Sequence, residues 1–140
     1  MKLNKIVKKI HQASVDKGWW TVPTMNGDWD MKFFINKDDS EIHDPVLLRL
    51  KHALVVERLG LIHSELSEAL EGYRKNAQDD KLPQYKAFDV ELTDALIRIL
   101  ETGGAFGIDF EELIKAKMAY NATREDHKVE NRSKSNGKRF

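Results

Sequence analysis

Apolar residues recur every three or four positions along most of the chain, which is the spacing that places them on one side of an α-helix. No stretch alternates apolar and polar residues convincingly in the manner of a β-strand. We predict four helices, over about residues 5–17, 45–75, 82–107 and 109–124. The pattern therefore predicts an all-α fold that resembles a four-helix bundle.

The expected ends of the first three helices carry residues that suit those positions. Asn4 is a candidate N-cap for the first helix, and Gly18 can end it. Asp44 is a good N-cap for the second helix, and Pro45 fits its first position because proline has no backbone N–H to leave unpaired. The third helix is expected to begin near residues 82–84, with a proline in its first turn.

The fourth helix is expected to follow the third directly. Asp109 and Glu112 have the spacing of a capping box at its start. A chain of 140 residues fits one domain. We place this domain at residues 1–127 and treat residues 128–140 as a polar C-terminal tail.

The segment 18–43 has no clear periodicity but is rich in aromatic residues. These residues are Trp19, Trp20, Trp29, Phe33 and Phe34. Long loops in compact domains are usually functional or disordered, and the aromatic content argues against disorder. Trp19 and Trp20 could stack on a nucleobase, or they could simply pack in the core.

Composition narrows the class of protein. Lys+Arg and Asp+Glu both count 23, and this balance argues against a general nucleic-acid-binding protein. Cysteine is absent, so a metal would have to be held by oxygen or imidazole ligands. The sequence has no secretory h-region and no apolar run long enough to span a bilayer. We therefore expect a cytoplasmic protein that does not bind membranes.

The second helix carries carboxylates on a side that otherwise looks apolar. Four leucines share that side: Leu47, Leu50, Leu54 and Leu61. At about 100° per residue, Glu65 and Glu68 continue the same stripe. They are either the polar end of an amphipathic helix, or acids that must be paired or bound to a cation because they face the interior.

The third helix repeats the three-residue spacing between acids. It is apolar on nearly every side, and its single polar strip contains Glu91, Asp94, Arg98 and Glu101. This strip either faces water or faces the glutamate pair of the second helix. We expect Arg98 to balance Glu91 or Glu101.

If the two acidic pairs face each other, four carboxylates converge. Like charges so close cannot all stay ionised without compensation, and a hard divalent cation such as Mg²⁺ supplies it. Such ions support cleavage of phosphoanhydrides. Di-iron bundles use Glu-x-x-His motifs, which this chain lacks, so an oxidase is disfavoured.

The motif E-x-x-E, followed after 22 residues by E-x-x-D, resembles the signature of the MazG-like nucleotide pyrophosphohydrolases of the all-α NTP pyrophosphatase superfamily. The segments "IHSELSEALEGYR", "ELTDALIRILETGGAFGIDFEELI", "KMAYNATR" and "HQASVDKGWW" are similar to the family's small phage and bacterial proteins. The resemblance covers roughly residues 5–127.

The resemblance implies a Mg²⁺-dependent reaction that converts an NTP or dNTP into the monophosphate and pyrophosphate, with Mn²⁺ as a substitute ion. It implies that Glu65, Glu68, Glu91 and Asp94 are the metal ligands. Either Glu65 or Glu68 would also be the general base. The family fold is a helical bundle completed by oligomerisation. The preferred base and sugar stay open.

The fourth helix places Lys117, Asn121 and Arg124 on one face. These residues either complement the helix dipole or bind the triphosphate. The apolar surface of the third helix predicts a second copy of the chain, in a homodimer or a dimer of dimers. The alternative to an enzyme is a non-catalytic helical module that senses nucleotides or assists assembly.

Overall fold

The computed structural model describes residues 2–137, and these residues are mostly helical. The helices are α1 (Leu3–Asp16), α2 (Pro45–Lys75), α3 (Ala87–Ala105), α4 (Phe110–Thr123) and α5 (Val129–Arg132). Two short antiparallel strands, β1 (Thr21–Val22) and β2 (Trp29–Asp30), form a small hairpin after α1. Three 3₁₀ turns complete the order: η1 (Met31–Phe33), η2 (Asp39–Glu41) and η3 (Glu125–His127).

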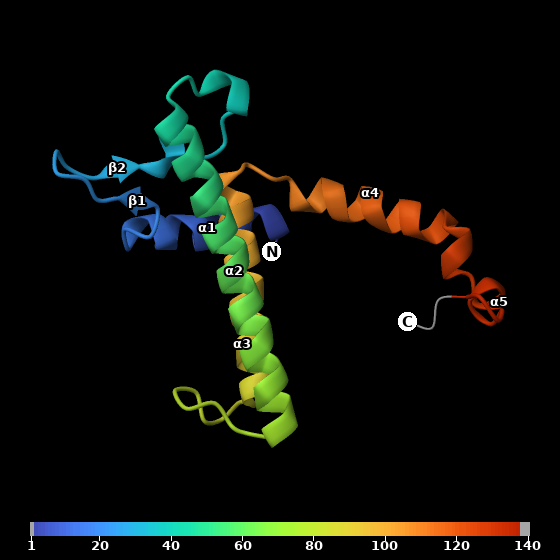
Figure 1. The fold of residues 1–140 in the computed structure, drawn as a ribbon. Coiled ribbons are helices and arrows are strands. Elements are labelled where there is room, and N and C mark those ends of the chain that lie inside the picture. Colours follow the sequence, from blue (N-terminus) through green and yellow to red (C-terminus); the bar gives the residue numbers. More distant parts are fainter. Residues whose placement is uncertain (1, 138–140) are drawn as a thin grey trace.

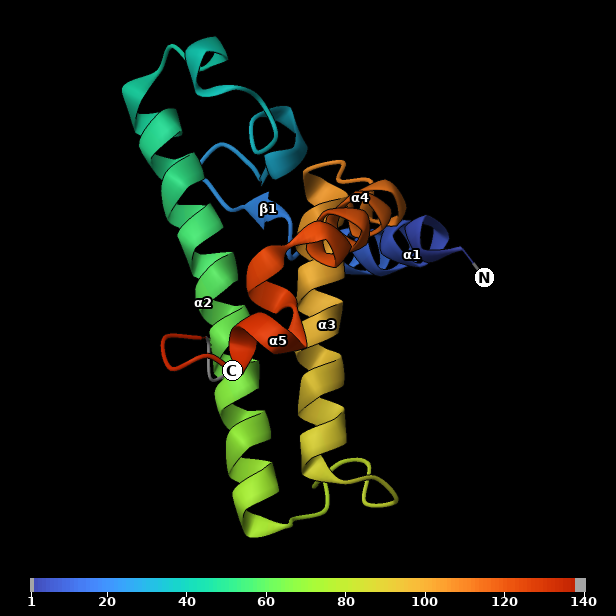
Figure 2. The same cartoon turned by 90° about the vertical axis from the view of Figure 1, so that its right-hand side faces the viewer.

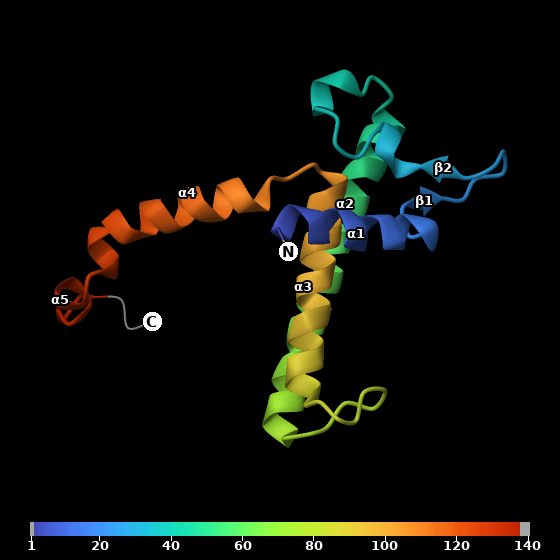
Figure 3. The ribbon, with the colours of Figure 1, turned by 180° about the vertical axis from the view of Figure 1, so that it is seen from behind.

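Helices α2 and α3 form a long antiparallel hairpin, and this hairpin is the body of the molecule (Figures 1 and 2). α1 packs across α3. α4 contacts α1 and then runs away from the hairpin, carrying α5 at its far end (Figure 3). The all-α prediction is confirmed in its general form, with three helices packed together and a fourth that projects.

The ends of α2 and α4 agree with the sequence prediction. The Asp44 side chain accepts hydrogen bonds from the backbone N–H groups of Val46 and Leu47, at 2.8 and 3.2 Å. Asn76 ends α2 in the left-handed conformation, with φ 49°. The Asp109 side chain caps α4 by accepting from the backbone N–H of Glu112 at 2.9 Å, which is the N-cap half of the predicted capping box.

The predicted start of the first helix was wrong. α1 begins at Leu3 with Lys2 as its N-cap, so Asn4 lies inside the helix. The Asn4 side chain instead donates to Asp109 Oδ1 at 2.8 Å, and its backbone N–H donates to Glu111 Oε1 at 3.2 Å. Asn4 therefore ties α1 to the start of α4.

The predicted start of the third helix was also wrong. α3 begins at Ala87, and residues 82–84 lie in the loop before it. Backbone pairing between Gln78 and Lys86 closes this loop, and the Asp79 side chain accepts two backbone N–H bonds within it. The loop satisfies its own backbone groups, so the helix starts only after it closes.

Part of the polar tail expected at 128–140 forms α5. Residues 138–140 of that tail lie outside the described residues, and so does residue 1 of the domain expected at 1–127. No helix within the described range of 2–137 is both long and apolar enough to cross a bilayer.

The aromatic segment after α1 is ordered and contains the hydrophobic core. Its buried cluster consists of Trp20, Met31, Phe34, Ile35 and Ile42. Leucines of the first half of α2 pack against this cluster. The cluster packs against the N-terminal half of α2 and the C-terminal end of α3. The C-terminal half of α2 and the start of α3 are not part of this cluster.

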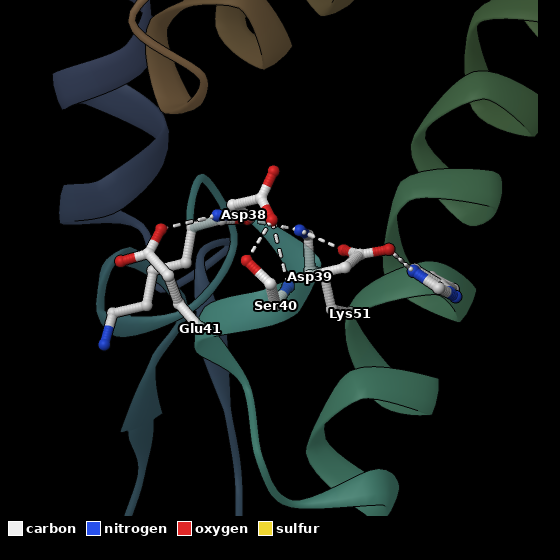
Figure 4. Close-up of polar contacts among 7 residues, drawn as sticks. Asp38, Asp39, Ser40, Glu41 and Lys51 are labelled. Carbon is white, nitrogen blue, oxygen red and sulfur yellow. Dashed lines mark hydrogen bonds and ion pairs between the residues drawn. The ribbon is translucent and has the colours of Figure 1, made fainter.

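Lys51 fastens this segment to α2 (Figure 4). Its side chain is only 10% exposed, and Nζ donates to the carbonyl of Lys37 at 2.5 Å and to Asp39 Oδ1 at 2.7 Å. Asp39 Oδ2 also lies 2.8 Å from His52 Nε2. These contacts fix η2 to the first half of α2.

Replacing Lys51 by methionine is expected to lower the free energy of unfolding by about 2 kcal/mol, because it leaves a carbonyl and a carboxylate without their donor. Urea denaturation of the two proteins measures this difference. Lys32→Met is the control, since Lys32 is 68% exposed in its pair with Asp30, and a change of less than about 0.5 kcal/mol is expected there. Equal effects of both substitutions would contradict the role of Lys51.

Candidate metal centre

Three acids meet between α2 and α3. Glu65 of α2 and Glu91 and Asp94 of α3 each offer a carboxylate oxygen, and these oxygens lie within 4.8 Å of one another. Glu65 is only 7% exposed, and the other two are half-buried. The polar strip of α3 therefore faces α2 and not the solvent.

Glu68 lies beside this group. Burial raises the pKa of Glu91 above its ordinary value, and the charge of Glu68, a hydrogen bond and charge from Glu65, and the charge of Asp94 raise the pKa further. Glu68 itself is exposed and stands outside the tight group of three. Three of the four acids of the motif thus form one group, and Glu68 acts on Glu91 through its charge.

Arg98 pairs with Glu65, so the expectation that it balances Glu91 or Glu101 was wrong. Its Nε lies 2.5 Å from Glu65 Oε1. Glu65 needs a cation because it is the most buried of the four acids, and an unpaired buried charge is costly. Glu101 already accepts a hydrogen bond from the indole Nε1 of Trp20 at 2.7 Å.

The donors fit a hard divalent cation. The group contains carboxylate oxygens only, which suit Mg²⁺ and Mn²⁺ better than softer metals. Within residues 2–137, Arg98 is the one basic side chain that forms an ion pair with these acids, so one cation faces four carboxylates. Burial is the largest cause of the raised pKa of Glu91, and this excess of negative charge raises it further.

The two tryptophans occupy different environments. Trp20 is 3% exposed; the guanidinium of Arg58 lies 4.7 Å from its ring centroid, and the His11 ring meets it at 5.1 Å. Its faces are covered, so Trp20 packs in the core. Trp19 is 62% exposed and keeps an accessible ring. Of the pair, Trp19 is the one available for stacking on a base.

The candidate phosphate-binding residues of α4 do not lie beside the acids. Arg124 forms a forked pair with Asp126, with distances of 2.9 and 2.5 Å. Lys117 Nζ lies 5.0 Å from the ring centroid of Tyr120. The Oδ1 atom of Asn121 is buried and has no hydrogen-bond partner in the described part of the chain. Because α4 runs away from the hairpin, one chain alone does not bring these groups to the carboxylates (Figures 1 and 3).

Arg58 is a residue of α2 that the sequence prediction missed, and its contacts are with the two tryptophans. It lies seven residues before Glu65, or about two helical turns, and therefore on the same side of α2. Its Nη2 donates to the carbonyl of Trp19 at 2.5 Å while its guanidinium covers Trp20. The helical spacing from Glu65 was the signal that could have identified it.

Comparisons of the chain with protein-family models, with curated proteins and with solved structures each found no match. The geometry of the α2–α3 interface and the spacing of its acids are therefore what supports an assignment of function.

Glu91→Gln is expected to stabilise the metal-free protein at neutral pH. Because folding raises the pKa of Glu91, its contribution to stability is present at low pH and is lost as the pH rises through the folded-state pKa. The substitution should raise the melting temperature in EDTA at pH 7 by about 3 °C and flatten its pH dependence. Thermal unfolding between pH 4 and 8 measures both.

Glu57→Gln is the matched control, because Glu57 is an exposed carboxylate on the same helix pair and lies outside the group of acids. It should leave the pH dependence unchanged. A lower melting temperature for Glu91→Gln in EDTA would mean that the Glu91 carboxylate stabilises the metal-free fold. That result would contradict the prediction that burial and neighbouring acids make this carboxylate destabilising.

Proposed function

We propose that this protein is a Mg²⁺-dependent nucleoside triphosphate pyrophosphohydrolase that converts an NTP or dNTP and water into the monophosphate and pyrophosphate. The observation that carries the proposal is the group formed by Glu65 of the E-x-x-E motif on α2 with Glu91 and Asp94 of the E-x-x-D motif on α3, whose carboxylate oxygens lie within 4.8 Å of one another. The resemblance of the motifs to MazG-like enzymes supports the same reaction.

Glu65, Glu68, Glu91 and Asp94 would hold the cation. When bound, Mg²⁺ neutralises phosphate oxygens and lowers the pKa of a bound water. Glu65 or Glu68 accepts the proton of the attacking water, and exposed Glu68 has the easier exchange with solvent. The water oxygen forms a new bond to phosphorus, and the anhydride bond between the α and β phosphates breaks.

The exposed apolar surface supports a homo-oligomer, as a homodimer or a dimer of dimers. Because the polar strip of α3 faces inward, its apolar sides face outward, and four large residues are exposed there: Leu92, Leu96, Ile97 and Ile99. Leu66, Leu70 and Tyr73 of α2 are exposed as well. Contiguous apolar surface of this kind marks an interaction site.

A second copy that covers these helices would complete a MazG-type bundle. It would also provide a way for α4 of one chain to reach the acids of another, so that Lys117, Asn121 and Arg124 contact the triphosphate. Trp19 remains the candidate for stacking on the base. Mg²⁺ is the expected ion, and Mn²⁺ is expected to replace it.

Glu68→Gln and Asp94→Asn are expected to reduce turnover by at least about 10²-fold, because each removes a charge from the metal and water site. The assay separates monophosphate, diphosphate, pyrophosphate and phosphate after incubation of the common NTPs and dNTPs with Mg²⁺. Glu57→Gln should retain wild-type turnover. Folded wild-type protein that binds nucleotides without producing pyrophosphate would favour the non-catalytic sensing or assembly module.

Leu96→Glu is expected to weaken self-association, because it places a charge on the exposed apolar side of α3, where Leu96 is 51% exposed. Size-exclusion chromatography with light scattering should show a dimer or larger species for the wild type and a shift toward monomer for the variant. Lys115→Glu, on the exposed surface of α4, is the control for the added charge. A wild-type protein that is monomeric at all concentrations would contradict the oligomer.

A further inference from the structure

Arg98 is a cation placed inside the acidic centre itself. It follows Asp94 by four residues on α3, so the two lie on the same side of that helix. Its Nε lies 2.5 Å from Glu65 Oε1, and the Glu65 side chain is 10% exposed while that of Arg98 is 36% exposed. The guanidinium thus neutralises the most buried acid and remains accessible from the solvent side.

The pairing uses one of the donors that Arg98 has. A guanidinium carries five N–H donors, and the strong pairs with carboxylates use two of them in parallel. Arg124 does this with Asp126 through Nε and Nη2. Arg98 bonds Glu65 through Nε alone, and its two terminal nitrogens form no hydrogen bond within residues 2–137.

A divalent cation in the centre would compete with Arg98. Glu65 belongs both to the ion pair with Arg98 and to the group of three acids whose oxygens lie within 4.8 Å of one another. A metal bound by that group would attract the Glu65 carboxylate and repel the guanidinium, and both effects weaken the ion pair. The terminal nitrogens of Arg98 would then be available to an anion that arrives with the metal.

We propose that Arg98 is a resident counter-ion that holds Glu65 before the metal binds and that binds a phosphate oxygen of the nucleotide once the metal takes over that carboxylate. The inference rests on the proposed function, because it assumes a divalent cation among the four acids. It assigns two separable effects to Arg98. The side chain opposes the binding of Mg²⁺ alone and favours the binding of Mg²⁺ together with a phosphate chain.

The test begins with isothermal titration of the full-length protein with Mg²⁺ alone. Arg98→Gln should bind Mg²⁺ roughly tenfold more tightly than the wild type, because a competing cation is gone. Arg98→Lys keeps the charge and should bind Mg²⁺ within about twofold of the wild type. Arg74→Gln is the matched control: it removes the exposed pair of Arg74 with Glu71, outside the centre, and should change nothing.

The second titration uses a non-hydrolysable nucleotide with an α,β-methylene bridge at saturating Mg²⁺. Arg98→Gln should bind this analogue roughly tenfold more weakly, despite its tighter metal site, because a charge-assisted bond to phosphate is lost. Arg98→Lys should also weaken it, since a lysine lacks the planar fork. Circular dichroism verifies that each variant is folded. If Arg98→Gln is not folded, Arg98→Lys carries the phosphate half of the test, and binding of the analogue as tight as in the wild type overturns the inference.

Opposite shifts in the two titrations support the inference. If Arg98→Gln binds Mg²⁺ no more tightly than the wild type, or binds the analogue at least as well, the inference is overturned while the proposed function stands. If neither the wild type nor Arg98→Gln binds Mg²⁺, the metal centre itself is wrong, and the inference falls with it. The first titration therefore distinguishes the two failures.

Discussion

The carboxylate of Glu65 lies in the interface between two long helices, where it is 7% exposed. A buried charge of this kind must be paired or bound to a cation, because the interior solvates it poorly. Arg98 pairs with it, and Glu91, whose pKa is raised by burial and by the neighbouring acids, belongs to the same group of carboxylates. Around Glu65, the interface between α2 and α3 is therefore built from acids and one arginine, while Ala69, Ala95 and Leu100 are buried apolar residues of the same two helices.

Because the acids occupy this part of the interface, several large apolar residues of α3 lie on its outer sides. Leu92, Leu96, Ile97 and Ile99 line the exposed sides of α3, in a position where a single-chain bundle would carry polar residues. The hydrophobic core of the chain lies elsewhere, in the aromatic segment around Trp20 and Ile35, and Lys51 fastens it to α2. The proposed second copy of the chain would cover the hairpin, and the same association would bring α4 of one chain to the acids of another.

Local signals in the sequence predicted much of this arrangement. Asp44 and Pro45 fixed the start of α2, and the i, i+3 spacing of Glu91 and Asp94 predicted one acidic side on α3. The errors concern interactions between distant segments. α3 begins late because Gln78 pairs with Lys86, Arg98 binds an acid of another helix, and α4 follows a direction set by its contact with α1. The burial of Trp20 likewise depends on Arg58 and Glu101, which are far from it in the chain.

The most direct test of the central claim is the binding of Mn²⁺ to the nucleotide-free protein, followed by the loss of the electron paramagnetic resonance signal of the free ion. The account predicts saturable binding by the wild type and none by a folded double variant, Glu65→Gln with Asp94→Asn, because that variant loses acids from both helices. Equal binding by the two proteins, or no binding by either, would contradict a metal centre between α2 and α3.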